Sequence, residues 1–493
     1  MKILDRRKFL KASAVAAGSA HSSRLLPRLF ASSYEGGTSA LPALPPNEAH
    51  LQTSNLIPNG RFMQGEIGSL PEGWSIGDGN PALRPFFKLI AGIGGTRELM
   101  AEGNGRKECY GYLRAPVRLG GGKTYRMRVR FRFSGMDDVN RHLVHGVFTQ
   151  KFNNGIFQYW KDGDWVIGEA HFAGPSGDEA GEVRLYFRYS SKGRVWWKEV
   201  SLQESNPIPP RPVKLAVSWG VGDMKHWENW LDAAGAKGAD IALMPELFNG
   251  ILDPMKAESE DGPSRKLMAN KARQWKMHVS GTTYVRRGDL VFNTAPLFDR
   301  EGKLIGTYDK NMVYEPELDW GATPGEGLPV FQTDIGKIGI IICYDSWFPE
   351  TVQMLALQGA ELVLMPNEGY YTELIHARSA DNGVFIAASS GANPAGVWDP
   401  AGNKAGEDNP DPTCGGPSAI LNYEKNERTR LFFVTVDLSK KISPAWWGGP
   451  MRSAPGGRRC RKTAMMPLEG GIAQEASRWY EVHNPWLQSK ISD

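Results

Sequence analysis

The chain reads Gly-Lys-Ile-Gly-Ile-Ile-Ile-Cys-Tyr-Asp-Ser-Trp-Phe-Pro-Glu from Gly336 to Glu350. Its run of β-branched residues predicts a buried strand, and the Pro349-Glu350 pair predicts the start of a helix. Cys343 lies on the turn between these two elements, so we expect its thiol to face outward above the sheet. The positive end of the following helix favours the thiolate form of this cysteine over the thiol.

Two charged residues stand at the ends of other predicted strands. Glu246 follows an apolar segment that begins at Ile241, and Lys310 follows one that begins at Leu304. Taken singly, each is an ordinary loop charge, and a cysteine is most often a small buried hydrophobic residue. Together, an acid, a cation and a thiol at strand ends are the groups that acyl transfer by a cysteine nucleophile requires.

Glu246, Lys310 and Cys343, in this order, resemble the Glu-Lys-Cys triad of the nitrilase superfamily, the carbon-nitrogen hydrolases. The resemblance covers about residues 211–440 and extends to the residues around each member of the triad. The matching segments are 244–247, 308–311, 342–350, 355–367 and 376–382. The resemblance implies an α/β fold, a nitrilase-like α-β-β-α sandwich. The alternation of apolar strands with helical stretches near 224–238, 263–276, 349–359 and 371–382 agrees with it.

The resemblance also implies a role for each residue of the triad. Cys343 attacks the substrate carbonyl and forms a thioester, and Glu246 acts as general base and then as general acid. Lys310, together with the backbone N–H of Tyr344, stabilises the oxyanion of the tetrahedral intermediate.

The family carries a second glutamate between the lysine and the cysteine. Counted back from Thr-Pro-Gly at 323–325, Glu317 fits this position best and Glu315 second. This residue is expected to position Lys310 and the substrate amine. The resemblance implies no cofactor, and no metal is expected because no cysteine or histidine pair has the spacing of a zinc site.

The strand predicted after Cys343 is followed by Asn367, Glu368 and Tyr370, which we expect to line the acyl pocket. Nitrile hydrolysis within the superfamily usually goes with Cys-Trp-Glu, whereas this chain has Cys343-Tyr344-Asp345, as in the amidase and carbamoylase branches. The resemblance therefore implies hydrolysis of a small-molecule amide or N-carbamoyl substrate. A nitrilase remains an alternative, as does an exported sugar-binding protein with an inactive hydrolase scaffold.

Composition narrows the class of protein further. The 493 residues exceed one ordinary domain, and 41% hydrophobic with 23% charged residues is typical of a folded protein. A net charge of +4 gives no reason to expect nucleic-acid binding, and no apolar run is long enough to span a bilayer. Four cysteines are too few for a disulfide scaffold. Whether one disulfide forms among Cys109, Cys414 and Cys460 stays open.

The N-terminal residues 5–11, with adjacent arginines followed by Phe-Leu-Lys, resemble a twin-arginine export signal. We expect a signal peptide over residues 1–33, a linker over 34–50, and a periplasmic or secreted protein. The alternative is a basic, helical N-terminus of a cytoplasmic protein.

Residues 51–205 are expected to form an all-β domain. In the segment 124–133 apolar residues alternate with Thr or Arg, and the segment 182–189 repeats the pattern, which predicts antiparallel strands with one buried face. Short strands between Gly-rich turns indicate a jelly-roll sandwich. Its opening and closing motifs resemble family-4-like carbohydrate-binding modules. Trp160 and Trp165 are candidates for stacking on a sugar, although core or rim tryptophans are the more common explanation.

A Pro-rich linker over residues 206–212 leads into the hydrolase domain, which we expect over 213–440. Residues 441–493 lack clear periodicity and are expected to be a C-terminal extension. The resemblance implies a homodimer.

Overall fold

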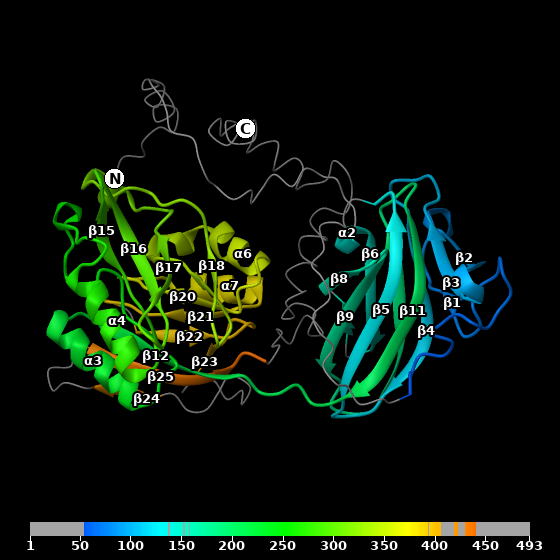
Figure 1. Cartoon of the computed structure of the whole chain (residues 1–493), viewed down its shortest axis with the longest axis horizontal. Coiled ribbons are helices and arrows are strands. Elements are labelled where there is room, and N and C mark those ends of the chain that lie inside the picture. The colour runs from blue at the N-terminus through cyan, green and yellow to red at the C-terminus, as the bar shows by residue number, and fades with distance from the viewer. Residues whose placement is uncertain are drawn as a thin grey trace, which may run out of the picture. The chain divides into compact units, whose positions relative to one another are not determined.

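The computed structural model describes residues 54–136, 139–150, 153–156, 158–392, 394–405, 419–422 and 429–439 (Figure 1). The expected signal peptide, the linker to residue 50 and the expected extension from residue 441 lie outside the described residues, as do Cys414 and Cys460. Cys109 is buried with a free thiol. Within the described ranges, none of the helices has the length and apolar character needed to cross a membrane.

The first part of the described chain is built from two antiparallel sheets. One has the strand order β1-β4-β10-β6-β7, with bounds Ser75–Ile76, Tyr110–Leu119, Glu179–Arg188, Leu143–Thr149 and Asn153–Gly155. The other has the order β2-β3-β11-β5-β9-β8, with bounds Phe86–Ala91, Arg97–Glu102, Arg194–Ser205, Thr124–Ser134, Trp165–Ala173 and Gln158–Asp162. Short helical segments lie at Pro81–Leu83 (η2), Ile93–Gly95 (η3) and Val139–His142 (α2).

The strands predicted from alternation are confirmed as β5 and β10. On β5 the apolar residues Tyr125, Met127, Val129 and Phe131 are fully buried, while the arginines between them are partly exposed. They join one core that side chains of both sheets fill, so the two sheets pack face to face. The jelly-roll connectivity and the domain bounds 51–205 remain predictions.

The second part also contains two sheets. The larger has the order β15-β16-β14-β13-β12-β25-β24, with β17 paired to β16. Its bounds are Thr283–Arg287, Leu290–Phe298, His278–Ser280, Ile241–Leu243, Pro212–Gly220, Thr429–Asp437, Ala419–Asn422 and, for β17, Leu304–Asp309. The smaller has the order β18-β19-β20-β21-β22-β23, with bounds Val330–Gln332, Lys337–Ile340, Leu362–Met365, Phe385–Ala388, Gly396–Trp398 and Lys404–Ala405.

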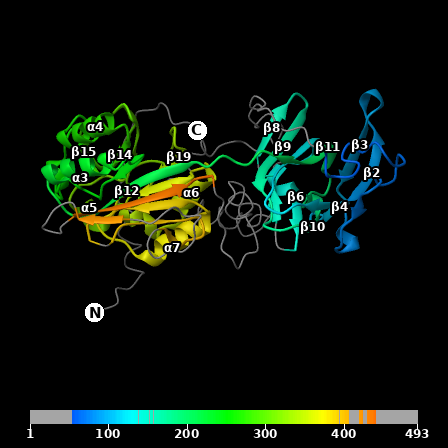
Figure 2. The same cartoon turned by 90° about the horizontal axis from the view of Figure 1, so that it is seen from below.

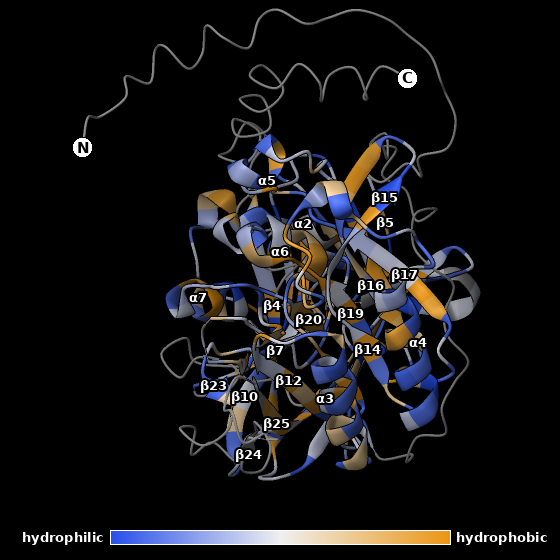
Figure 3. Cartoon of the chain, turned by 90° about the vertical axis from the view of Figure 1, so that its left-hand side faces the viewer, coloured by the Kyte–Doolittle hydropathy of each residue, from blue (hydrophilic) through white to orange (hydrophobic). Residues whose placement is uncertain are grey.

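Helices cover the outer faces of these two sheets, which bury their inner faces against each other. Helices α3 (Met224–Ala236) and α4 (Pro263–Trp275) pack on the larger sheet, and α6 (Pro349–Leu357) and α7 (Thr372–Asn382) pack on the smaller one. Figures 1 and 2 show these two helix pairs around the stacked strands. In Figure 3 the central strands are largely coloured as hydrophobic, whereas α3 and α4 carry many hydrophilic residues. The mixed α/β architecture expected from the sequence is present, and its layers are consistent with an α-β-β-α sandwich.

Local sequence explains how the helices on the larger sheet form and pack. Asp223 caps α3 by accepting a hydrogen bond from the His226 N–H at 2.9 Å. Trp227, Trp230 and Leu231 follow at helical spacing and are fully buried. Gly235 allows α4 to approach closely, because a Cβ there would lie 2.1 Å from the Trp275 ring.

The sheets bring three strand ends together. Glu246 lies shortly after β13, Lys310 directly after β17 and Cys343 shortly after β19. Two short helical segments complete the surroundings: α5 (Glu315–Asp319), and η5 (Cys343–Trp347), which lies between β19 and α6. A third segment, η4, spans Pro254–Lys256.

Candidate active site

The two predicted glutamates hold Lys310 between them in a buried cluster. Lys310 Nζ lies 2.9 Å from Glu246 Oε1 and also donates to Glu317 Oε2. The exposed fractions of these three side chains are 2%, 5% and 8%, respectively, so the ion pairs are shielded from water. Glu315, the second choice for the supporting glutamate, is exposed. The structure therefore brings Glu317, and not Glu315, to the lysine.

Cys343 sits on a strained turn that presents its thiol to this cluster. Its φ is +44°, a left-handed value that non-glycine residues rarely adopt. The backbone N–H of Cys343 donates to the carbonyl of Pro366 at 3.1 Å, which ties the turn to the end of β20. The Cys343 thiol donates to the carbonyl oxygen of Gly369 at 3.5 Å, and the Glu246 carboxylate lies close enough for its negative charge to act on the thiol.

The expectation that a helix N-terminus holds Cys343 as a thiolate is wrong for this conformation. Burial, followed by the charge of Glu246, raises the pKa of the Cys343 thiol well above its usual range, and the Lys310 ammonium offsets only part of this. In addition, η5 separates the cysteine from α6, so the helix does not begin at the thiol. The resting group is a neutral thiol near a carboxylate.

Lys310 stays protonated. Burial by itself lowers the pKa of an ammonium group, but the negative charges of Glu246 and Glu317 outweigh this and raise the pKa of Lys310. The site thus holds a fixed positive charge beside the nucleophile. Tyr344 is the second residue of η5, and the first N–H groups of a helical turn have no acceptor within that turn.

Sequence reasoning missed Asn293, which lies on β16. Its Nδ2 donates to Glu246 Oε1 at 2.8 Å and to Glu317 Oε1 at 3.0 Å, so one amide holds both carboxylates. The Tyr284 hydroxyl donates to the same Glu317 oxygen at 3.0 Å. The signal in the sequence was an asparagine inside the otherwise apolar strand Leu290–Phe298.

The sequence alone assigned no role to Asp345. Its buried carboxylate accepts hydrogen bonds from the Ile342 N–H at 2.8 Å, the Met312 N–H at 2.8 Å and the Tyr308 hydroxyl at 2.7 Å. Burial raises the pKa of Asp345 from 3.8 to about 6, although these three donors act in the opposite direction. This carboxylate joins the cysteine turn to the segment that carries Lys310.

The three residues expected to line the acyl pocket differ in their surroundings. Asn367 is fully buried, and its amide donates to the carbonyls of Met365 at 2.6 Å and Ser389 at 2.9 Å. Glu368 is exposed, and its backbone N–H donates to Glu246 Oε2 at 3.1 Å. Partial loss of hydration and the charge of Glu246 raise the pKa of the Glu368 carboxyl.

Tyr370 is half-buried, and its hydroxyl donates to the carbonyl of Pro394. Aromatic rings also gather beside the nucleophile. The Tyr344 ring lies 5.5 Å from the ring of Tyr314, and the Trp347 ring lies 5.2 Å from the ring of Tyr371. Within the described part of the chain, no three His, Cys, Asp or Glu side chains are grouped so as to hold a metal ion.

The second part of the described chain is similar in sequence to known proteins. Residues 221–421 match the model of the Carbon-nitrogen hydrolase family. Similar proteins include the chloroplastic omega-amidase of Arabidopsis thaliana, 29% identical over 200 residues, which are 36% of this chain and 54% of that protein. The N-carbamoylputrescine amidase of Solanum tuberosum is 32% identical over 155 residues, 28% of this chain and 51% of that protein.

The chain spans about half the length of these relatives. Among solved structures, an amidase from Nesterenkonia sp. is 24% identical with a TM-score of 0.38, covering 46% of this chain and 92% of that one.

Proposed function

We propose that the protein hydrolyses a non-peptide carbon-nitrogen bond, in an amide or an N-carbamoyl group, through a thioester on Cys343. One observation carries the proposal: the Glu246 carboxylate accepts a hydrogen bond from the Lys310 ammonium at 2.9 Å and lies near enough to Cys343 that, after burial, its charge raises the pKa of the thiol. A base near the nucleophile and a cation beside it are the arrangement that cysteine acyl transfer requires.

The first half of the reaction forms the acyl-enzyme. The thiol proton passes to Glu246 as Cys343 Sγ attacks the carbonyl carbon, and a tetrahedral oxyanion forms. Lys310 Nζ and the backbone N–H of Tyr344 stabilise this oxyanion, and losing one such donor typically raises the barrier by about 3–4 kcal/mol. Glu246 then returns the proton to the leaving nitrogen, the C–N bond breaks, and a thioester and a free amine remain.

The second half releases the product. Water attacks the thioester carbon while Glu246 takes one of its protons, and the resulting oxyanion is held as before. Collapse breaks the C–S bond, the proton goes back to the sulfur, and an acid leaves. For a carbamoyl substrate the released acid is a carbamic acid, which decomposes to carbon dioxide and an amine or ammonia.

Glu317 and Asn293 support this chemistry without changing protonation state. Glu317 pairs with Lys310, and the Asn293 amide fixes the two carboxylates on either side of the lysine. Because each group is buried and already hydrogen-bonded, little reorganisation accompanies the development of charge.

The substrate class rests on two supports. Relatives named omega-amidase and N-carbamoylputrescine amidase favour an amide or carbamoyl group. The exposed carboxylate of Glu368, next to the Glu246 contact, suits a substrate with an amine or hydroxyl group remote from the scissile bond. Nitrile hydrolysis is the second candidate, since the same thiol can attack a nitrile carbon.

The test is a panel of amides, N-carbamoyl compounds and nitriles, scored by ammonia and acid release and by mass spectrometry of the intact chain. We expect an acyl adduct on Cys343 with an amide or carbamoyl substrate. Cys343→Ala should abolish turnover and adduct with an unchanged melting temperature. Turnover retained by Cys343→Ala would falsify the mechanism, and turnover of nitriles alone would reassign the substrate class.

Three further expectations remain proposals. They are export by a twin-arginine signal, a carbohydrate-binding role for the domain over 51–205, and a homodimer. N-terminal sequencing of exported material, glycan binding by the full chain and sedimentation analysis test them in turn. The alternative of an inactive scaffold fails if iodoacetamide preferentially modifies Cys343 and destroys turnover.

A further inference from the structure

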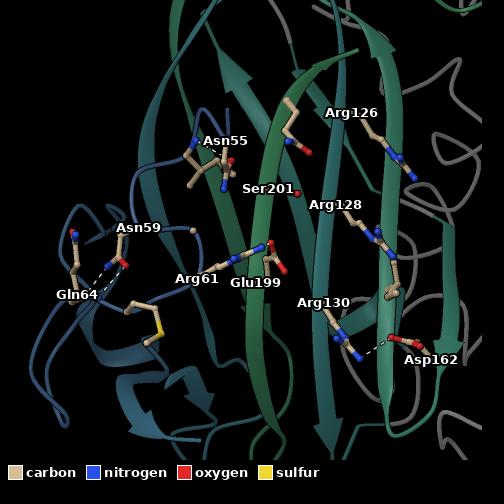
Figure 4. A pocket seen from close by; sticks show the side chains of 15 residues that line it. Asn55, Asn59, Arg61, Gln64, Arg126, Arg128, Arg130, Asp162, Glu199 and Ser201 are labelled. Atoms are coloured by element: carbon tan, nitrogen blue, oxygen red, sulfur yellow. Dashed lines mark hydrogen bonds and ion pairs between the residues drawn. The ribbon is translucent and has the colours of Figure 1, made fainter. Parts of the chain in front are cut away.

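We propose that a groove in the sheet containing β11, β5 and β9 binds an acidic polysaccharide, with Arg128 at its centre. The groove has a volume of about 670 Å³ and is lined largely by polar side chains (Figure 4). It belongs to the part of the chain before the hydrolase domain, so the proposal is independent of the hydrolytic function.

Three arginines of β5 supply the positive charge. Arg126, Arg128 and Arg130 are spaced by two residues, which places their side chains on the same face of the sheet, and all three line the groove. Figure 4 shows them in succession along one strand, beside Ser201 and Glu199 of the neighbouring strand. Along β5 these arginines alternate with apolar residues, which are buried on the opposite face of the sheet.

The outer arginines are paired, and the central one is not. Arg126 forms an ion pair with Glu169 at 2.5 Å, and Arg130 forms one with Asp162 at 2.8 Å. Arg128 lies directly opposite Glu169 in the strand register, yet that carboxylate is engaged by Arg126. Among the described residues, Arg128 has neither a hydrogen-bond acceptor nor a carboxylate partner.

The paired arginines also retain unused donors. The Nε atoms of Arg126 and Arg130 are buried and have no hydrogen-bond partner among the described residues. Guanidinium groups bind carboxylates and sulfates through two parallel hydrogen bonds, and such charge-assisted bonds are stronger than neutral ones. The groove therefore offers one guanidinium without a counterion, between two guanidinium groups that are paired.

The remaining lining favours a sugar over a nucleic acid. None of the 15 lining residues is aromatic, so no platform for stacking bases is present. The carboxylates of Asp162 and Glu199 also line the groove, where they are paired with Arg130 and Arg61 and can accept hydrogen bonds from sugar hydroxyls. Alternating acids and hydroxyls, as in a uronic acid polymer, match this mixture of groups.

The groove is a different surface from the tryptophan platform suggested by the sequence. The Trp165 ring has three cations over it, with Arg130, Arg132 and Lys198 at 5.5, 5.6 and 5.1 Å from its centroid. These cation–π contacts occupy the ring. Recognition by charge and hydrogen bonding therefore replaces recognition by stacking in the proposed site.

The test measures binding of the full chain to polygalacturonate oligomers, to neutral xylan oligomers and to oligo-dT, by isothermal titration at low and moderate salt. We expect the galacturonate oligomer alone to bind well. Arg128→Gln should weaken this binding by about tenfold or more, the loss of one charge-assisted pair. Arg118→Gln, which removes an exposed arginine from β4 in the other sheet, is the matched control and should leave affinity unchanged.

Two further variants keep the result decisive if Arg128→Gln folds poorly. Arg128→Lys keeps the charge but loses the planar pair of donors, and should fall between wild type and Arg128→Gln. Ser201→Trp fills the groove without removing charge and should also abolish binding. Equal weakening by Arg118→Gln, equal affinity for xylan, tighter binding of oligo-dT, or no binding of galacturonate by the folded wild type would each overturn the proposal.

Discussion

The Asp345 carboxylate accepts a hydrogen bond from the backbone N–H of Met312 at 2.8 Å and so connects the turn that carries the nucleophile to the segment that carries the lysine. Neither Asp345 nor Met312 acts on the substrate in the proposed mechanism. Their contact nevertheless sets the distance between Cys343 and Lys310, because each lies two residues from one end of the bond.

Asp345→Asn should lower kcat with a smaller effect on KM. The amide keeps one acceptor oxygen, but its NH₂ group faces a backbone donor, and an unsatisfied buried group costs about 1–3 kcal/mol. Steady-state kinetics on the best substrate of the panel checks this. Tyr308→Phe removes one of the three donors and keeps the carboxylate, so its effect should be milder. A purely structural role would lower the melting temperature and leave the kcat of the folded fraction intact.

Glu317→Gln should lower kcat/KM by about 10- to 100-fold, the loss expected for a charged hydrogen-bond partner of Lys310. Glu315→Gln is the matched control, since it lies on the same short helix α5 but is exposed, and it should behave as wild type. If both variants lose activity equally, or neither does, Glu317 has no special part in holding the lysine.

Lys310→Ala should abolish turnover and also lower the free energy of unfolding by about 3–5 kcal/mol, because two buried carboxylates lose the cation between them. Differential scanning fluorimetry measures the second effect, with the exposed Lys303→Ala as control. Adding Glu317→Gln to Lys310→Ala should restore part of the stability and none of the activity. Near-normal rates in Lys310→Ala would remove the lysine from the oxyanion site.

His145 should make the sandwich of β1–β11 sensitive to acid. It is fully buried, Trp197 donates to its Nε2 at 2.9 Å, and burial lowers its pKa from 6.5 to about 3. Between these values the unfolded chain binds more protons than the folded one. The free energy of unfolding therefore decreases as pH falls from about 6.5, by up to about 1.4 kcal/mol per pH unit.

Hydrogen exchange of peptides from β6 and β11, corrected for intrinsic rates, checks this pH dependence. His145→Gln keeps an acceptor for Trp197 without a titrating ring, and should flatten it. His171→Gln, which replaces a histidine on β9, should leave the pH dependence unchanged. A dependence that survives His145→Gln would assign it to another group.

Local pattern was enough to find the strands and most helices. The alternation over 124–133 fixed which residues of β5 are buried, and helices predicted near 224–238, 263–276, 349–359 and 371–382 appear as α3, α4, α6 and α7. The buried face of a strand and the position of a helix both depend on residue spacing within a short segment. This spacing can be read directly from the sequence. The domain bounds and the roles assigned to site residues remain predictions.

The protonation of Cys343 could not be obtained in the same way. The argument for a thiolate used only the helix that follows the cysteine, whereas its pKa is raised by burial and then by the carboxylate of Glu246, which lies far upstream in the sequence. Asn293 and Asp345 were missed for the same reason, since their partners lie on other elements. Interactions of this kind depend on how the sheets pack and carry only a weak local signal.

The left-handed backbone at Cys343, with φ of +44°, limits which nucleophiles this scaffold can evolve. A serine has a single γ atom and tolerates the turn much as cysteine does. A threonine carries two, and β-branched side chains are strongly disfavoured at positive φ. Replacement of Cys343 by threonine is therefore disfavoured by the backbone conformation alone, whatever the difference in reactivity between a thiol and a secondary alcohol.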